Sequence, residues 1–401
     1  MSDTFDPMTG RYTGSPIGFF LLVMQTSLLT VLTLGLYRFW ARTRVRRYVW
    51  SATSPGGDPF EYTGTGLEKL LGFLFAIVVL AVFLGLMQLI LFYFGLSLFA
   101  SDLSEQEMAV RLSFAYSSVF FIAPLIWIAR YRARRYKLSR TRWRGLRFGM
   151  EPGAFSFMIK AVGHSFVTGI TFGLLLPRQT WYLAKYQMDR TWYGDAKFQM
   201  EGGWFYLFPA MKHSLLGVAI MAISLVLMGV VTPVFGIGIG VGYVWLLIGI
   251  VHYKVQSYIT ILENSTLGAD VRFGAVPSTA EIVMKVLSGL ILTGVVGALL
   301  SGALIALSAM TLGIDPAALQ AGERFEIAPI GAVVTALSGL VIAVLFGALV
   351  KVFLTQPITR IIVEQTAVLN PEGLDEIRQR AEQDQVDADG LADALDVGGA
   401  F

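Results

Sequence analysis

Apolar and polar positions are separated into long blocks along this chain. Apolar runs of membrane-spanning length occur eight times, at 16–37, 69–99, 112–129, 155–177, 205–230, 233–252, 282–311 and 329–354. A helix of about 20 residues, rising about 1.5 Å per residue, crosses a hydrocarbon core of roughly 30 Å. The pattern therefore predicts a mainly α-helical, polytopic membrane protein.

Two of these runs are interrupted by polar residues near their middles. Gln25, Thr26 and Ser27 interrupt run 16–37, and Lys160 and His164 interrupt run 155–177. Such segments suit two short half-helices, which membranes tolerate only against protein or a watery cavity. We therefore predict six crossing helices plus two re-entrant or interfacial helical segments, with eight crossing helices as the alternative. The crossing helices form three hairpins, 69–129, 205–252 and 282–354.

Short strings of alternating polar and apolar residues stand just before several apolar runs. They read "PFEYTG" (59–64), "GLRFGM" (145–150), "DAKFQM" (195–200) and "DVRFGA" (270–275), and "GRYTGSP" (10–16) resembles them. A period of two beside Gly and Asp turn residues is typical of short strands. Isolated hairpins are only marginally stable, so these strands should pair into one small sheet. Alternatively, the strings are loops that begin helices.

The chain also repeats itself. "ARTRVRRY" (41–48) returns as "ARYRARRY" (129–136), and "RTWYGDAKFQMEGG" (190–203) aligns with "RTRWRGLRFGMEPG" (140–153). With the alternating strings, these matches predict five degenerate copies of one unit. We expect a repeat-built transmembrane domain over 1–360 and an acidic tail over 361–401, partly disordered.

Composition and charge give the class and the orientation. Hydrophobic residues make up 55% of the chain and charged residues only 15%, far from the values of a soluble domain. In the six-crossing arrangement one face holds 23 Lys and Arg residues, while the opposite connections hold only Arg324, with Arg111 at an edge. The positive-inside rule then predicts that the repeated units and the C-terminal tail are cytoplasmic.

One region resembles a known family. The stretch "TLGLYRFWARTRVRRYVWSAT" (33–53), followed by "GDPFEYTGTGLEKLLGFL" (57–74), is similar to the signature of the YjgN-like bacterial inner-membrane proteins. That family is built around a domain of unknown function. Residues 174–194 depart from the pattern, because most of the arginines are missing there. The resemblance implies a multi-pass protein of the bacterial inner membrane and no particular reaction.

The repeated arginines have two interpretations. Arg beside Trp and Tyr at the end of an apolar run is typical of an interfacial anchor that sets membrane depth. The same clusters could bind anionic lipid headgroups, since each basic residue near an anionic surface contributes on the order of 1 kcal/mol. The residues concerned are Arg42, Arg44, Arg46, Arg47, Arg130, Arg132, Arg134 and Arg135.

Ionisable and polar side chains also recur inside the apolar runs, at similar distances after the strand strings. Such groups are costly in lipid and should face protein or a hydrated cavity, as at the repeat interfaces of transporters. The alternative is that the lysines reach to the basic face from amphipathic helices. The candidate polar ring comprises Gln25, Lys160, His164, Lys212, His213 and Lys285.

Chemistry-bearing motifs are missing from the sequence. It has no cysteine, three scattered histidines, no P-loop and no G-x-S-x-G elbow. We therefore expect no catalytic residue, no metal, no cofactor and no nucleic-acid partner. Two function classes stay open: a transporter or channel-like protein for an anionic or amphipathic solute, and a non-catalytic membrane-organising protein that binds anionic lipids or a protein partner. The oligomeric state is undetermined.

Overall fold

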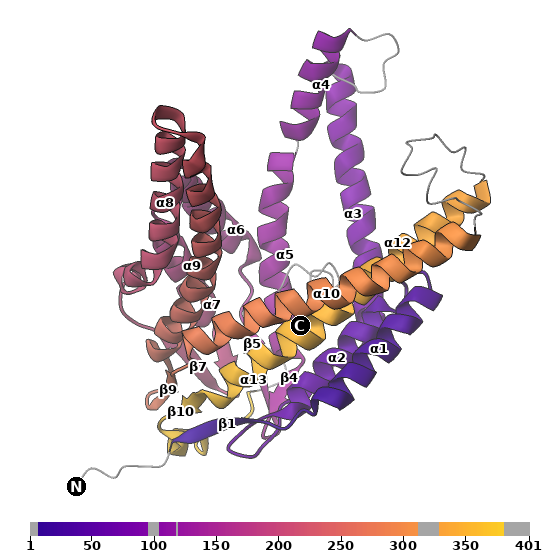
Figure 1. The fold of residues 1–401 in the computed structure, drawn as a ribbon. Coiled ribbons are helices and arrows are strands. Elements are labelled where there is room, and N and C mark those ends of the chain that lie inside the picture. Colours follow the sequence, from indigo (N-terminus) through magenta and orange to yellow (C-terminus); the bar gives the residue numbers. More distant parts are fainter. Residues whose placement is uncertain (1–6, 95–103, 118, 312–328, 381–401) are drawn as a thin grey trace. The chain divides into compact units, whose positions relative to one another are not determined.

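A computed structural model describes residues 7–94, 104–117, 119–311 and 329–380 of this mostly helical chain (Figure 1). The chain divides into two compact units. Unit 1 comprises Met1–Met8, Asp58–Ala275 and Ala367–Phe401, and unit 2 comprises Thr9–Gly57 and Val276–Thr366.

In the described ranges, unit 2 contains one strand pair, five α-helices and one π-helical turn. Strand β1 (Met8–Tyr12) pairs antiparallel with β2 (Thr53–Pro55), and helices α1 (Pro16–Leu32) and α2 (Arg38–Ala52) lie between them in the chain. The remaining elements are α10 (Thr279–Thr311), α12 (Pro329–Val350), the π-helical turn η3 (Lys351–Thr355) and α13 (Gln356–Glu364). Helix α12 packs on both α1 and α10.

The helices of unit 1 come in three groups. The first is α3 (Gly66–Tyr93), α4 (Glu105–Ser117) and α5 (Val119–Ser139); the second is α6 (Ala154–Ile170) and α7 (Leu176–Met188). The third is η1 (Trp204–Met211), α8 (Lys212–Val230), η2 (Pro233–Phe235) and α9 (Gly236–Glu263).

Small residues bring α8 and α9 together. A Cβ at Gly217 would lie 2.6 Å from the amide nitrogen of Leu246, and one at Gly242 would lie 2.8 Å from that of Met221. Glycine at these positions lets the two backbones approach closely, as the sequence "GIGIGVG" (236–242) predicts.

Unit 1 also carries an antiparallel sheet in which strands follow one another in chain order. The strands are β3 (Glu61–Tyr62), β4 (Thr141–Trp143), β5 (Leu146–Met150), β6 (Thr191–Tyr193), β7 (Ala196–Met200), β8 (Ser265–Leu267) and β9 (Val271–Ala275), with β10 (Thr366–Val368) beside β9. Strands β1, β3, β5, β7 and β9 fall on the alternating strings, so that prediction is confirmed.

Each of these five strands, here called incoming, leads into helices. After the helices the chain forms the next strand, here called outgoing, which lies beside the incoming one in the sheet. The same main-chain bond closes each pair at 2.8–2.9 Å: Thr13 N to Ala52 O, Thr63 N to Arg140 O, Glu151 N to Arg190 O, Glu201 N to Asn264 O, and Val276 N to Gln365 O. Each outgoing strand also begins with a hydroxyl that donates to the carbonyl four residues earlier, at 2.6–2.9 Å; these are Thr53, Thr141, Thr191, Ser265 and Thr366.

This pairing bears on the number of crossings. Strand β5 pairs with β6, and β1 with β2, so α6–α7 and α1–α2 each leave a strand and return to its partner. A single crossing by run 155–177 or 16–37 would place paired strands on opposite sides of a membrane. The alternative of eight crossing helices therefore does not fit the pairing.

Within the described ranges, five helices are long and apolar enough to cross a membrane: Gly66–Tyr93, Trp204–Val230, Pro233–Glu263, Thr279–Met310 and Gly331–Glu364. Run 112–129, the sixth predicted crossing, falls on α4 and α5 and includes residue 118, which lies outside the described residues. The count of six stays a prediction.

An aromatic core supports the sheet of unit 1, and part of the C-terminal region packs into it. Trp143 and Phe148 pack against Tyr193, with ring centroids 5.6 and 4.6 Å apart. Leu374 and Ile377 are buried in the same cluster. Of the predicted acidic tail, residues 361–380 are thus within the described structure, whereas 381–401 lie outside it.

Candidate functional site

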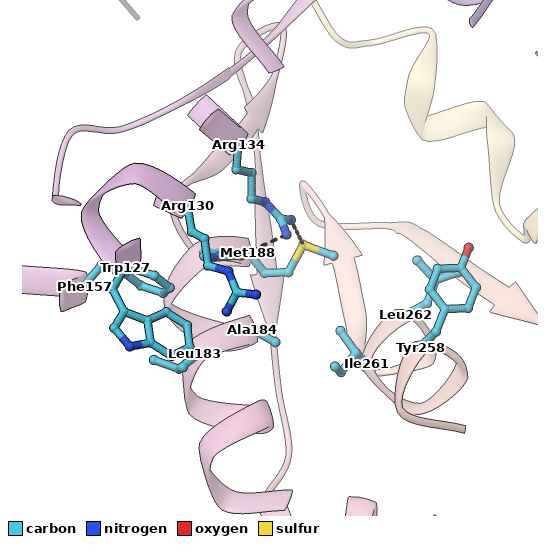
Figure 2. Close-up of a pocket in the computed structure, with 11 residues that line it drawn as sticks. Trp127, Arg130, Arg134, Phe157, Leu183, Ala184, Met188, Tyr258, Ile261 and Leu262 are labelled. Atoms are coloured by element: carbon cyan, nitrogen blue, oxygen red, sulfur yellow. Dashed lines mark hydrogen bonds between the residues drawn. The ribbon is translucent and has the colours of Figure 1, made fainter. Parts of the chain in front are cut away.

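The last turns of α5 contribute two arginines to a pocket of about 450 Å³ in unit 1 (Figure 2). Arg130 and Arg134 lie one helical turn apart, so both face the same space. Arg130 stacks its guanidinium 5.0 Å from the ring centroid of Trp127. Arg134 donates a hydrogen bond of 2.9 Å to Gln187 Oε1 and lies 3.8 Å from Met188 Sδ.

The rest of the pocket is largely apolar. Tyr258, Ile261 and Leu262 of α9 form the wall opposite the arginines (Figure 2). Further lining comes from Phe157 of α6 and from Leu183, Ala184, Gln187 and Met188 of α7. The pocket thus combines two cationic groups with an aliphatic and aromatic surface, as suits an amphipathic ligand.

No carboxylate balances this charge: in the ranges that the structure describes, neither Arg130 nor Arg134 forms an ion pair. Burial lowers the pKa of the Arg134 guanidinium, yet arginine keeps its proton in proteins. A half-buried cation that has lost water without gaining an anion is poorly solvated. An anionic ligand would supply the missing partner.

The pocket lies where three helices end. Arg134 precedes the first residue of β4, Thr141, by about two helical turns, and Met188 and Leu262 precede their strands by about one turn each. Arginine with Trp and Tyr at such helix ends is typical of the headgroup region of a bilayer.

The other predicted arginines of α5, Arg132 and Arg135, do not line the pocket. Arg135 Nε donates to the carbonyl oxygen of Met150 at 3.0 Å. Arg132 is half-buried, and burial followed by the charge of Arg135 lowers its pKa. Among the eight predicted lipid contacts, Arg130 and Arg134 are therefore the two that line the pocket.

The arginines of α2 differ in exposure. Arg44 donates to Tyr37 Oη at 3.1 Å and to Gln25 Oε1 at 3.2 Å. Arg46 is buried and stacks on Trp50, whereas Arg42 is half-buried and Arg47 is exposed.

The predicted polar ring is divided between the units. Gln25 and Lys285 belong to unit 2, and the other four residues belong to unit 1. His164 stacks on Tyr182 and lies 3.2 Å from Arg178, and exposed Lys160 lies over the Tyr186 ring.

On α8, Lys212 is exposed and His213 meets the His252 ring at 4.6 Å. None of the interactions described for these residues joins the α6 pair to the α8 pair. Groups of three or more metal-ligating side chains are also not found in the described ranges.

Helices α1–α2 and α6–α7 form two similar hairpins. Equivalent residues of the two hairpins, such as Phe19 and Phe157, are 138 positions apart in the chain. Phe19 and Phe157 are fully buried, and each packs on a tyrosine with ring centroids 5.6 and 5.7 Å apart. Those tyrosines, Tyr48 and Tyr186, donate to the carbonyl oxygen that precedes the hairpin, at 2.9 and 3.0 Å.

The turns of the two hairpins match as well. Gly35 and Gly173 adopt φ of +93° and +87°. Their amides donate to Thr30 O and Thr168 O at 2.7 and 2.8 Å. One local structure thus recurs in "TVLTLGL" (30–36) and "TGITFGL" (168–174).

Comparisons with known proteins agree with the sequence signature. The family model described as "Bacterial protein of unknown function (DUF898)" matches residues 7–394. The chain is also similar to Inner membrane protein YjgN of Salmonella typhimurium (strain LT2), with 31% identity over 77 residues, which are 19% of this chain and 20% of that protein.

No solved structure matches this chain. The match to YjgN covers only about a fifth of either protein. The family model, in contrast, covers nearly the whole chain, and both findings confirm the resemblance to YjgN-like proteins. This chain therefore belongs to the DUF898 family of bacterial proteins of unknown function.

Proposed function

We propose that this protein is a non-catalytic organiser of the bacterial inner membrane, which holds anionic lipids at the basic ends of its helices. The observation that carries the proposal is the pocket in which Arg130 and Arg134 meet an apolar wall without an acidic partner among the described residues. Such a surface attracts an anionic headgroup and leaves its chains in an apolar environment.

The proposal includes an orientation. The chain crosses the membrane six times, α1–α2 and α6–α7 enter and leave on one side, and all five strand pairs are cytoplasmic. In support, that face carries 23 Lys and Arg residues. We also propose that the five strand pairs are degenerate copies of one unit, because the same closing bond recurs in each.

Lipid preference tests the function. The purified protein would be exchanged into nanodiscs with equal phosphatidylglycerol and phosphatidylcholine, and the retained lipid measured by native mass spectrometry. We expect phosphatidylglycerol to be retained in excess. Equal retention of both lipids would contradict the proposal.

A transport function is the second candidate, favoured by the two hairpins that turn back and carry polar groups. On α6–α7, for example, Gln179 donates to Ser165 Oγ at 2.8 Å, and discontinuous helices of this kind often surround transported solutes. Proteoliposomes with fluorescent phosphatidylglycerol or with trapped inorganic phosphate separate the two functions. An organiser leaves both rates at those of protein-free vesicles, whereas faster flux of either would favour transport.

A further inference from the structure

We infer that the α5–α9 pocket is a discrete site for one phosphate-bearing lipid, whose phosphate contacts Arg130 and Arg134 and whose first chain segment lies on Tyr258, Ile261 and Leu262. The inference rests on the proposed function, since it names the lipid class and the place where it binds. It adds saturable, stoichiometric binding to a general attraction for anionic lipids.

Charge complementarity selects a phosphate. Guanidinium groups bind phosphate oxygens through paired, charge-assisted hydrogen bonds, which are shorter and stronger than neutral ones. Arg134 donates to Gln187 from one of its terminal nitrogens. Arg130 contacts the Trp127 ring, and its N–H groups form no hydrogen bond in the described structure. Two guanidinium groups one turn apart can therefore share one phosphate.

The apolar wall selects a lipid over a free anion. An inorganic phosphate would leave the surface of Tyr258, Ile261 and Leu262 uncovered, whereas an acyl chain would cover it. The cavity of about 450 Å³ lies within the range of small-molecule sites, and it suits a headgroup with the start of a chain.

The position of Arg134 is set by α7. Gln187 Oε1 accepts from one terminal nitrogen and Met188 Sδ lies against the other, so the guanidinium is oriented before any ligand binds. Pre-organisation of this kind lowers the entropic cost of binding. Gln187 is thus a positioning residue, and its removal should weaken lipid binding while both arginines stay.

The experiment is native mass spectrometry of the full-length protein, titrated in detergent with dioleoyl phosphatidylglycerol, dioleoyl phosphatidylcholine, glycerol phosphate and inorganic phosphate. We expect one phosphatidylglycerol to bind with saturation. The double variant R130Q/R134Q should lose at least about tenfold in affinity, and Gln187→Leu should lose less. The control variant R11Q/R272Q removes two exposed strand arginines and should keep the site.

Each outcome decides between the alternatives. Equal affinity for inorganic phosphate, or an unchanged R130Q/R134Q variant, overturns the inference. If phosphatidylglycerol is preferred but never saturates, the inference fails while the proposed function stands; if it is not preferred at all, both fail. Arg130 is exposed, so the single variant Arg130→Gln should fold as the wild type and gives a readout even if the double variant does not fold.

Discussion

The α1–α2 and α6–α7 hairpins have the same framework and different charges. Both bury a phenylalanine, anchor a tyrosine hydroxyl on the preceding carbonyl and turn at a glycine with positive φ. Yet α2 carries arginines at 38, 42, 44, 46 and 47, whereas α7 carries only Arg178 and Lys185 as cations. The shared framework therefore does not require five arginines in its second helix.

Removal of the buried phenylalanine from either hairpin should destabilise the protein more than any other change considered for the hairpins. Phe19→Ala or Phe157→Ala should lower the free energy of unfolding by about 3 kcal/mol. This value is near the low end of the cost of a buried Phe→Ala substitution, because the unfolded side chain can still contact lipid or detergent. Phe172→Ala is the matched control, since Phe172 is 98% exposed and Phe157 only 1%. Unfolding in detergent measures all three, and equal losses at 157 and 172 would refute the shared framework.

The turn glycines should matter next. Gly35→Ala or Gly173→Ala forces an L side chain into positive φ and should cost about 1–2 kcal/mol, although no atom lies within 4 Å of the new Cβ. Gly163→Ala, inside α6 and equally unobstructed, should instead stabilise the protein by up to about 1 kcal/mol. The same unfolding experiment measures the opposite signs, and a stabilising turn substitution would show that the turns are not as described.

A smaller effect is expected at the anchoring tyrosines. Tyr48→Phe and Tyr186→Phe each remove one hydrogen bond, at 2.9 and 3.0 Å, and should cost about 1 kcal/mol. The two losses should be similar because the two contacts are similar. Denaturant unfolding measures both losses. If only one of the two substitutions lowers the free energy of unfolding, the two tyrosines do not play the same part in their hairpins.

The smallest effect on stability should come from giving α2 a residue of α7. R42T introduces the residue found at 180 and should change the free energy of unfolding by less than about 1 kcal/mol. The retained phosphatidylglycerol should fall, because each basic residue near the headgroups contributes on the order of 1 kcal/mol. A large loss of stability with unchanged lipid would mean that Arg42 serves the fold alone.

Local patterns predicted half of the strands, and the reason is physical. Strings such as "GLRFGM" alternate over several residues, so β5 can be recognised from sequence. Its partner β6 has only three residues, Thr191–Tyr193, which is too short for a periodic signal. The hydroxyl residue at the start of each outgoing strand was the available clue, because it recurs at the same place after each helix.

The candidate site was only partly predictable. Arg130 and Arg134 stand out in the repeated basic string, but Gln187 and Tyr258 come from helices far along the chain. Only tertiary packing brings such residues together, so no spacing could reveal the pocket. The candidate polar ring stays a prediction, with Gln25 and Lys285 in unit 2 and its other four residues in unit 1.

In the proposed orientation both hairpins enter and leave on the same side of the membrane. The natural chain has no cysteine, so single cysteines can be placed at the exposed positions Glu61, Gln199 and Asp270, with Val231 between α8 and α9 as the opposite-face control. When intact cells are exposed to an impermeant thiol reagent, the cysteines at 61, 199 and 270 should be labelled to the same extent, and the cysteine at 231 to a different extent. Unequal labelling of the cysteines at 61 and 199, as eight crossing helices would require, would overturn this orientation.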